Sequence, residues 1–162
     1  MDGAIGTQLR HVLELLDGDV AKVYLELGLP EYRPRFSPIV RTIVAEGPLS
    51  IRDLATAVGV THSAASQTVA QLQRAGFVTL QPGSDARQRI VHLTDKTREL
   101  LPTIEAEWKA TTAAMAELDA ELSVPLGRVL AEVVAAVSQR SFQERISSRG
   151  VVENQAQRVA ES

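Results

Sequence analysis

The chain has 162 residues, of which 44% are hydrophobic and 23% are charged, values that are typical of one soluble globular domain. It contains no cysteine, which excludes disulfides, thiolate metal ligands and cysteine nucleophiles. Charged residues interrupt every apolar stretch before the length of about 18 residues that a membrane span needs. The amino-terminal residues also lack the features of a signal peptide, so we expect a cytoplasmic protein.

The formal net charge of −3 is distributed unevenly along the chain. Residues 1–49 carry 5 basic and 7 acidic side chains, residues 50–98 carry 6 and 3, and residues 99–162 carry 6 and 10. A positive segment within an acidic protein is where a polyanion would bind. A chance fluctuation accounts for the same numbers equally well, so charge alone leaves both interpretations open.

Two helices are predicted in the amino-terminal part of the chain. The first covers residues 5–29, where apolar residues recur every three or four positions, with a bend or break at residues 17–19. A loop with two prolines follows over residues 29–36. Ser37 then predicts the N-cap of a second helix, which ends at Gly47.

A helix-turn-helix unit is predicted next. Ser50, with an aspartate three residues later, forms an approximate capping box that opens a short helix, and Gly59 ends this helix. A second helix begins at Thr61 or His62 and is closed by Gly76. Two helices joined by a turn of about three residues form a helix-turn-helix.

The remaining sequence predicts a hairpin and two further helices. Two β-favouring runs, residues 77–81 and 89–93, surround a polar turn. Thr94 caps a long helix whose apolar stripe includes Trp108, and Ser123 marks the start of a last helix. The apolar stripe of this last helix consists of Leu126, Val129, Leu130, Val133, Val134 and Val137.

This order predicts a mainly α fold with a small β-hairpin wing. A winged helix-turn-helix over residues 37–94 is flanked by long N- and C-terminal dimerisation helices in residues 1–36 and 95–146, and residues 147–162 form a frayed tail of the same structural domain. The apolar stripes at both ends are expected to form a homodimer interface: Leu9, Val12, Leu13 and Leu16, with Val129, Val133 and Val137. Packing within one subunit is the alternative for any single residue of these stripes.

Motifs of common enzymes are absent. The sequence has no GxGxxG, P-loop, HExxH or GxSxG pattern. Its three histidines, His11, His62 and His92, lie 51 and 30 residues apart, which is not the local spacing of metal ligands. We therefore expect neither catalysis nor a cofactor or metal.

The second helix of a helix-turn-helix lies in the major groove of double-stranded DNA and packs on its own domain with the opposite face. Ala65, Val69 and Leu72 form the expected packing face. The side chains expected to contact DNA are His62, Ser63, Ala64, Ser66, Gln67, Gln71 and Arg74. Small uncharged residues permit close approach and glutamine can pair with adenine, whereas an ordinary solvated polar face is the alternative.

The hairpin contributes arginines beside its turn. Arg87 and Arg89 are expected to enter a narrow minor groove, where the negative potential is enhanced. Asp85 is expected to orient Arg87 through a charge-assisted hydrogen bond. An exposed ion pair that contributes little is the alternative.

These residues together resemble a known family. Leu54-Ala55, Gly59, Ser63, Val69, Leu72, Gly76-Phe77-Val78, Asp85-Ala86-Arg87 and Leu93-Thr94 are similar to the multiple-antibiotic-resistance repressor (MarR) family of winged-helix regulators. The resemblance implies a homodimer with intertwined end helices, a palindromic operator and often a small ligand between the dimerisation and DNA-binding regions. Gln67 and Gln71 stand where many members carry arginine or lysine, which leaves the operator sequence open.

Aromatic residues flank the DNA-binding unit. They are Tyr24, Tyr32, Phe36 and Trp108, four of the six aromatic residues in the chain. Aromatic side chains line many small-molecule sites, and Arg10, His11 and Arg41 would hold a carboxylate or phenolate beside them. The alternative is that these rings fill the hinge between two lobes.

The sequence thus predicts a DNA-binding transcriptional regulator. We expect a repressor that binds a palindromic operator as a homodimer and is released by a small aromatic or phenolic ligand. A winged helix that contacts another protein in place of DNA is the alternative, because a neutral recognition face and net acidity also suit that role.

Overall fold

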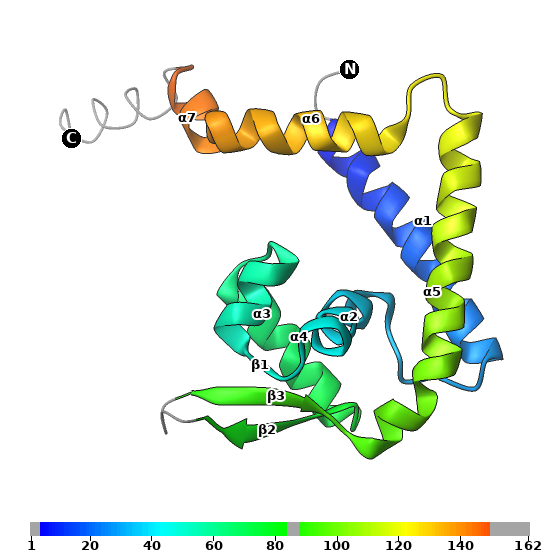
Figure 1. Ribbon diagram of the computed structural model, residues 1–162. Helices are drawn as coiled ribbons and strands as arrows, with labels where there is room; N and C mark the ends of the chain where they lie inside the picture. The colour runs from blue at the N-terminus through cyan, green and yellow to red at the C-terminus, as the bar shows by residue number, and fades with distance from the viewer. Residues whose placement is uncertain (1–3, 84–87, 150–162) are drawn as a thin grey trace, which may run out of the picture. The chain divides into compact units, whose positions relative to one another are not determined.

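The computed structural model describes residues 4–83 and 88–149, and the chain divides into two compact units, residues 1–111 and residues 112–162 (Figure 1). Among the described residues, no helix combines the length and the apolar character needed to cross a membrane. The fold class predicted from the sequence is confirmed: the chain is mainly helical, with one small antiparallel sheet.

The first helix, α1 (Ile5–Glu26), runs without interruption, so the predicted bend at residues 17–19 is wrong. An exposed glycine such as Gly18 costs a helix only about 1 kcal/mol relative to alanine, which a helix of this length tolerates. Helix α1 also ends earlier than predicted. Gly28 adopts a φ of 75°, and the Leu29 N–H returns to the Tyr24 carbonyl oxygen at 2.8 Å.

A short 3₁₀ helix, η1 (Pro34–Phe36), leads directly into α2 (Ser37–Glu46). The predicted N-cap at Ser37 is wrong, because this residue already lies within α2 and its side chain does not cap the helix. Its Oγ instead accepts a hydrogen bond of 2.9 Å from Trp108 Nε1. A tertiary partner has therefore replaced the local cap.

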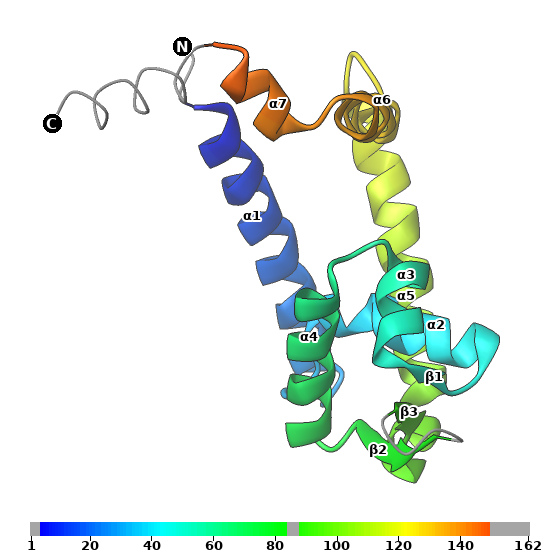
Figure 2. The same cartoon turned by 90° about the vertical axis from the view of Figure 1, so that its left-hand side faces the viewer.

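The helix-turn-helix follows the prediction closely. Strand β1 (Leu49–Ser50) leads into α3 (Ile51–Val58), and a short loop joins α3 to α4 (His62–Arg74), as Figure 2 shows. Ser50 Oγ accepts the Asp53 N–H at 3.2 Å and caps α3. Gly59 has a φ of 75°, which places it in the left-handed conformation that ends this helix.

The sheet contains one strand more than predicted. Strands β2 (Val78–Pro82) and β3 (Arg89–Leu93) form the hairpin, and β1 pairs with the other edge of β3, which gives the order β1-β3-β2. Leu49 lies opposite Val91, and Leu80 lies opposite the same residue on the other side. A strand of two residues is too short to show a period-2 pattern, so no pattern in the sequence predicts β1.

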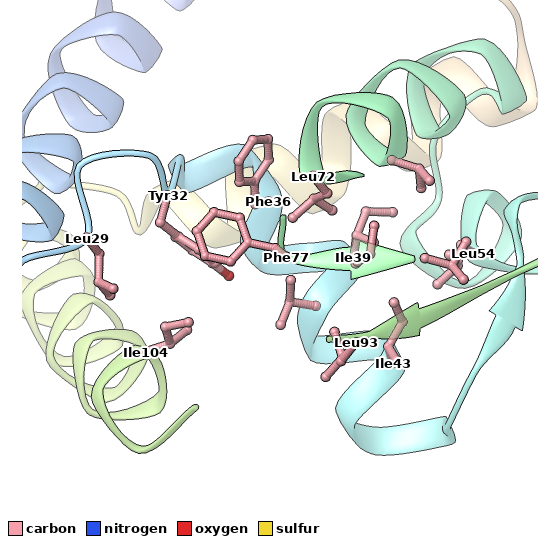
Figure 3. Close-up of a cluster of buried hydrophobic side chains, with 14 of the residues drawn as sticks. Leu29, Tyr32, Phe36, Ile39, Ile43, Leu54, Leu72, Phe77, Leu93 and Ile104 are labelled. Carbon is pink, nitrogen blue, oxygen red and sulfur yellow. The ribbon is translucent and has the colours of Figure 1, made fainter. Parts of the chain in front are cut away.

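The hydrophobic core of the first unit lies between the helices and the sheet. Figure 3 shows Leu54 from α3, Leu72 from α4 and Ile39 from α2 converging with Phe77 and Leu93 from the sheet region. The first part of α5 (Asp95–Glu121) contributes Ile104, which is fully buried. Thr94 caps α5 as predicted, because its Oγ1 accepts the Thr97 N–H at 3.2 Å.

The second unit contains the end of α5, α6 (Leu126–Gln139) and α7 (Phe142–Ser147). Helix α7 was not predicted as a separate element, although Ser141 and Glu144 form a complete capping box at its start. Helix α6 carries the predicted apolar stripe, and none of its residues is buried. Residues 150–162, the larger part of the predicted tail, lie outside the described residues.

Candidate nucleic-acid interface

Helix α4 packs on its own unit through the predicted face. Ala65, Val69 and Leu72 are each at most 1% exposed and belong to the buried side of the helix. Their spacing of four and three residues places them on one side of an α-helix. The opposite side is therefore the one that a ligand or a partner can reach.

The residues predicted to contact DNA lie on that opposite side. Exposed members of the set are His62, Ser63, Ala64, Gln67 and Arg74, while Ser66 and Gln71 are partly exposed. Ser63, Gln67 and Arg74 follow one another at intervals of four and seven, so they form a single stripe along α4. Arg74 is the one charged side chain in the helix, which leaves a surface of small and amide side chains.

Gln71 differs from the other members of the set. Its Oε1 is buried and has no hydrogen-bond partner among the described residues. An unsatisfied buried amide oxygen costs about 1–3 kcal/mol relative to one that is hydrogen-bonded. Gln71 therefore lies at the flank of the exposed stripe and keeps one amide oxygen unsatisfied.

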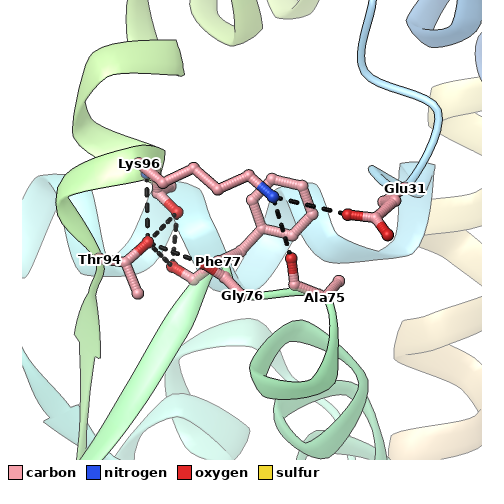
Figure 4. A network of polar contacts seen from close by, with 7 residues as sticks. Glu31, Ala75, Gly76, Phe77, Thr94 and Lys96 are labelled. Carbon is pink, nitrogen blue, oxygen red and sulfur yellow. Dashed lines mark hydrogen bonds and ion pairs between the residues drawn. The ribbon is translucent and has the colours of Figure 1, made fainter.

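The carboxyl end of α4 is held by a network that sequence patterns did not reveal. Figure 4 shows Thr94 and Lys96 reaching the end of α4: Thr94 Oγ1 donates to the Gly76 carbonyl at 2.8 Å, and Lys96 Nζ donates to the Ala75 carbonyl at 3.3 Å. Lys96 Nζ also lies 3.5 Å from Glu31 Oε2 and 4.9 Å from the Phe77 ring centroid. These contacts join partners more than 15 residues apart, which no local motif encodes.

The same network extends one turn into α5. Thr97 is fully buried, and its Oγ1 donates to the Phe77 carbonyl at 2.6 Å. Thr97 Oγ1 also lies 3.0 Å from Thr94 Oγ1. The start of α5 and the end of α4 therefore share hydrogen bonds, so the direction of α4 is tied to that of α5.

The wing is described in part. Asp85 and Arg87 lie outside the described residues, so their predicted roles stay predictions. Arg89 begins β3, lies opposite Pro82 and is exposed. Its side chain is accessible to a nucleic acid, as the prediction requires.

The four aromatic residues predicted to line a ligand site are almost wholly buried in the first unit. Tyr24 and Tyr32 have ring centroids 4.7 Å apart, and those of Tyr32 and Phe36 are 5.8 Å apart. Trp108 is covered by Arg41, whose guanidinium carbon lies 4.5 Å from the ring centroid. The rings thus pack on one another and on their neighbours, and a ligand between them would have to displace these contacts.

A buried carboxylate lies beside these rings. Glu107 of α5 is 4% exposed, and it accepts hydrogen bonds from the Tyr24 hydroxyl and from Thr111 Oγ1. Burial, followed by the hydrogen bond to Glu107, raises the pKa of the Tyr24 phenol above its ordinary range. The phenol stays neutral and donates a hydrogen bond to Glu107, which links α1 to α5.

This geometry defines a winged helix-turn-helix protein: a capped helix-turn-helix, a hairpin wing and an exposed second helix of largely uncharged character. The sequence model of the MarR family matches residues 37–89, so the winged helix-turn-helix of this chain is similar to that family. The predicted resemblance is confirmed. No curated protein sequence matches the chain.

Solved structures of the same fold cover most of the chain. The PcaV transcriptional regulator from Streptomyces coelicolor, solved with its natural ligand, is 18% identical with a TM-score of 0.63 over 86% of this chain and 93% of its own. Overoxidized AbfR bound to DNA is 18% identical with a TM-score of 0.61 over 83% and 90%. The regulator SlyA is 18% identical with a TM-score of 0.60 over 91% and 99%. At these identities the likeness establishes the fold, which is that of MarR-family transcriptional regulators.

Proposed function

We propose that the protein is a sequence-specific transcriptional regulator, a repressor that binds double-stranded DNA through α4 in the cytoplasm. The observation that carries this proposal is the exposed stripe of α4. Ser63 and Gln67 present short polar groups to the outside, while the other side of the helix is fully packed. A helix held in this way can enter the major groove and read base edges with its amides.

The regulator acts as a homodimer in this proposal. Leu13 of α1 is 60% exposed and Val133 of α6 is 52% exposed, together with most of the apolar residues near them. Exposed apolar stripes of this kind mark protein interfaces. A symmetric dimer carries two copies of α4, which would read two half-sites about 34–36 Å apart in a palindromic operator.

A small aromatic or phenolic ligand is proposed to release the protein from DNA. PcaV, which shares the fold, was solved with its natural ligand, which supports the idea without identifying a ligand for this chain. Because the predicted aromatic residues pack on one another, a ligand that enters there would change the environment of Trp108. Quenching of Trp108 fluorescence together with weaker operator binding is the expected result with salicylate as the probe.

The experiment that tests DNA recognition begins with genomic fragments selected by the protein, followed by mobility shifts on the selected site and on random duplex at one salt concentration. Gln67→Ala should weaken binding to the selected site by about 1–3 kcal/mol and change binding to random duplex much less. Gln73→Ala is the matched control, because Gln73 is also exposed on α4 but lies outside the stripe. It should bind both duplexes as the wild type does.

Two outcomes contradict the proposal. Equal losses of Gln67→Ala on both duplexes would mean that Gln67 only positions the backbone. Absence of any salt-sensitive affinity for duplex DNA would instead favour a protein–protein interaction module, since phosphate contacts make DNA binding fall steeply with salt.

A further inference from the structure

A concavity of about 470 Å³ lies between the segment that precedes α2 and the carboxyl end of α4. It is lined by Glu31, Arg33, Arg35 and Phe36 on one side and by Gln71 and Arg74 of α4 on the other. Its volume falls within the range of about 300–1,000 Å³ that is common for small-molecule sites. The residues come from parts of the sequence some 40 positions apart, so the fold alone brings them together.

Three guanidinium groups line this concavity, and none of them is held in an ion pair among the described residues. Arg33, Arg35 and Arg74 form no ion pair with any carboxylate of residues 4–83 and 88–149. Elsewhere in the chain, Arg98 pairs with Asp95 at 2.7 Å and Arg128 pairs with Glu132 at 3.1 Å. Like charges brought together without partners favour the binding of an anion.

The one carboxylate at the rim is already engaged. Glu31 Oε2 lies 3.5 Å from Lys96 Nζ, the contact drawn in Figure 4, so its charge is offset from outside the concavity. A neighbouring concavity of about 580 Å³ shares Arg33 and Arg35 and adds one arginine, Arg10, but two carboxylates, Glu14 and Asp17. The excess of positive charge is therefore greater on the α4 side.

Gln71 adds a polar side chain to the arginines. Its Oε1 is buried without a partner among the described residues, and its side chain lines the same concavity. The NH₂ group of the same amide is a hydrogen-bond donor. An anion in the concavity would then receive hydrogen bonds from Gln71 as well as from the arginines.

We propose that this concavity is an oxyanion site, which binds a phosphate or carboxylate group through Arg33, Arg35 and Arg74 with Gln71 as an additional donor. Guanidinium groups bind such oxyanions in a bidentate manner, with charge-assisted hydrogen bonds. The oxyanion comes either from a free small acid or from a phosphate of the DNA backbone beside α4. Binding of a DNA phosphate at this site rests on the proposed function, whereas binding of a free acid does not.

The test of the site is a calorimetric titration of the wild-type protein with inorganic phosphate, at an ionic strength held constant with chloride. The wild type should show saturable binding, and Arg33→Ala with Arg35→Ala in one chain should weaken it at least about tenfold. Arg98→Ala is the matched control, because Arg98 is an exposed arginine that does not line the concavity. A second variant, Gln71→Glu, places a negative charge at the site and should also weaken phosphate binding.

The salt dependence of binding to random duplex DNA distinguishes the two possible sources of the oxyanion. If a DNA phosphate occupies the site, the double arginine variant should flatten the plot of log affinity against log salt by about one unit or more, and phosphate should compete with duplex. If the site serves a free acid, the slope should stay unchanged while phosphate binding is lost. Either result supports the oxyanion site.

The proposal is overturned if wild-type protein shows no saturable phosphate binding and the double variant keeps the wild-type slope. Equal losses in the double variant and in Arg98→Ala would overturn it as well, since they would indicate a diffuse charge effect. If duplex binding is absent altogether but phosphate binding depends on Arg33 and Arg35, the oxyanion site stands and the proposed DNA-binding function fails.

Discussion

Helices α4 and α6 have similar apolar spacing but opposite burial. The apolar residues of α4 are buried by the rest of the first unit, with Val69 1% and Leu72 0% exposed. Those of α6 in the second unit stay open, with Val133 52% and Val134 65% exposed. Periodicity therefore identifies which side of a helix is apolar, whereas only the surrounding structure shows what covers it.

The apolar residues of the two helices are therefore covered in different ways. The core around α4 belongs to a single chain, so α4 is supported before any partner is present. The stripe of α6 is not covered within its own unit, and the proposed homodimer would cover it. Substitutions in the two helices should consequently differ in how their effects depend on protein concentration.

The largest effect is expected from Val133→Asp in α6. Burying an unpaired carboxylate costs at least about 2 kcal/mol per subunit, and a symmetric interface contains the substitution twice. The dissociation constant of the dimer should therefore rise about a thousandfold. Sedimentation equilibrium measures this constant. Ala131→Asp adds the same charge outside the stripe and should leave the dimer intact. A Val133→Asp protein that dimerises as the wild type does would show that α6 is not the interface.

In α4, Leu72→Ala should lower the free energy of unfolding by about 2–5 kcal/mol, because the side chain is fully buried and leaves a cavity. Urea denaturation at several protein concentrations measures this loss, which should be present at all of them. Leu130→Ala in α6 is the counterpart, since Leu130 is 45% exposed. Its effect should shrink as dilution favours the monomer. If the stability losses of both variants depended on protein concentration in the same way, the two helices would not differ in what covers them.

A smaller effect is expected at the junction of α1 and α5. Tyr24→Phe removes a donor from the buried Glu107 carboxylate and should cost about 1–3 kcal/mol of stability. A double-mutant cycle with Glu107→Gln measures the coupling between the two side chains by chemical denaturation. Strictly additive losses would mean that the hydrogen bond contributes nothing beyond the packing of the Tyr24 ring.

Local sequence patterns were sufficient to predict most of the secondary structure and the packing face of α4. Ser50 and Thr94 cap their helices as predicted, since a cap depends on residues within one turn. The packing side of α4 follows from the positions of Val69 and Leu72, because the helical period alone sets it. These features are encoded within a few residues and need no knowledge of the fold.

Contacts between residues that are distant in the sequence could be found only in the tertiary structure. Ser37 bonds to Trp108 and does not cap α2, and β1 exists because Leu49 finds Val91 across the sheet. Arg33 and Arg74 line one concavity only after α4 has packed beside the segment that precedes α2. Such hydrogen bonds and charge clusters form only where residues far apart in the sequence lie close together in space. Packing determines which residues do so, and local sequence spacing does not.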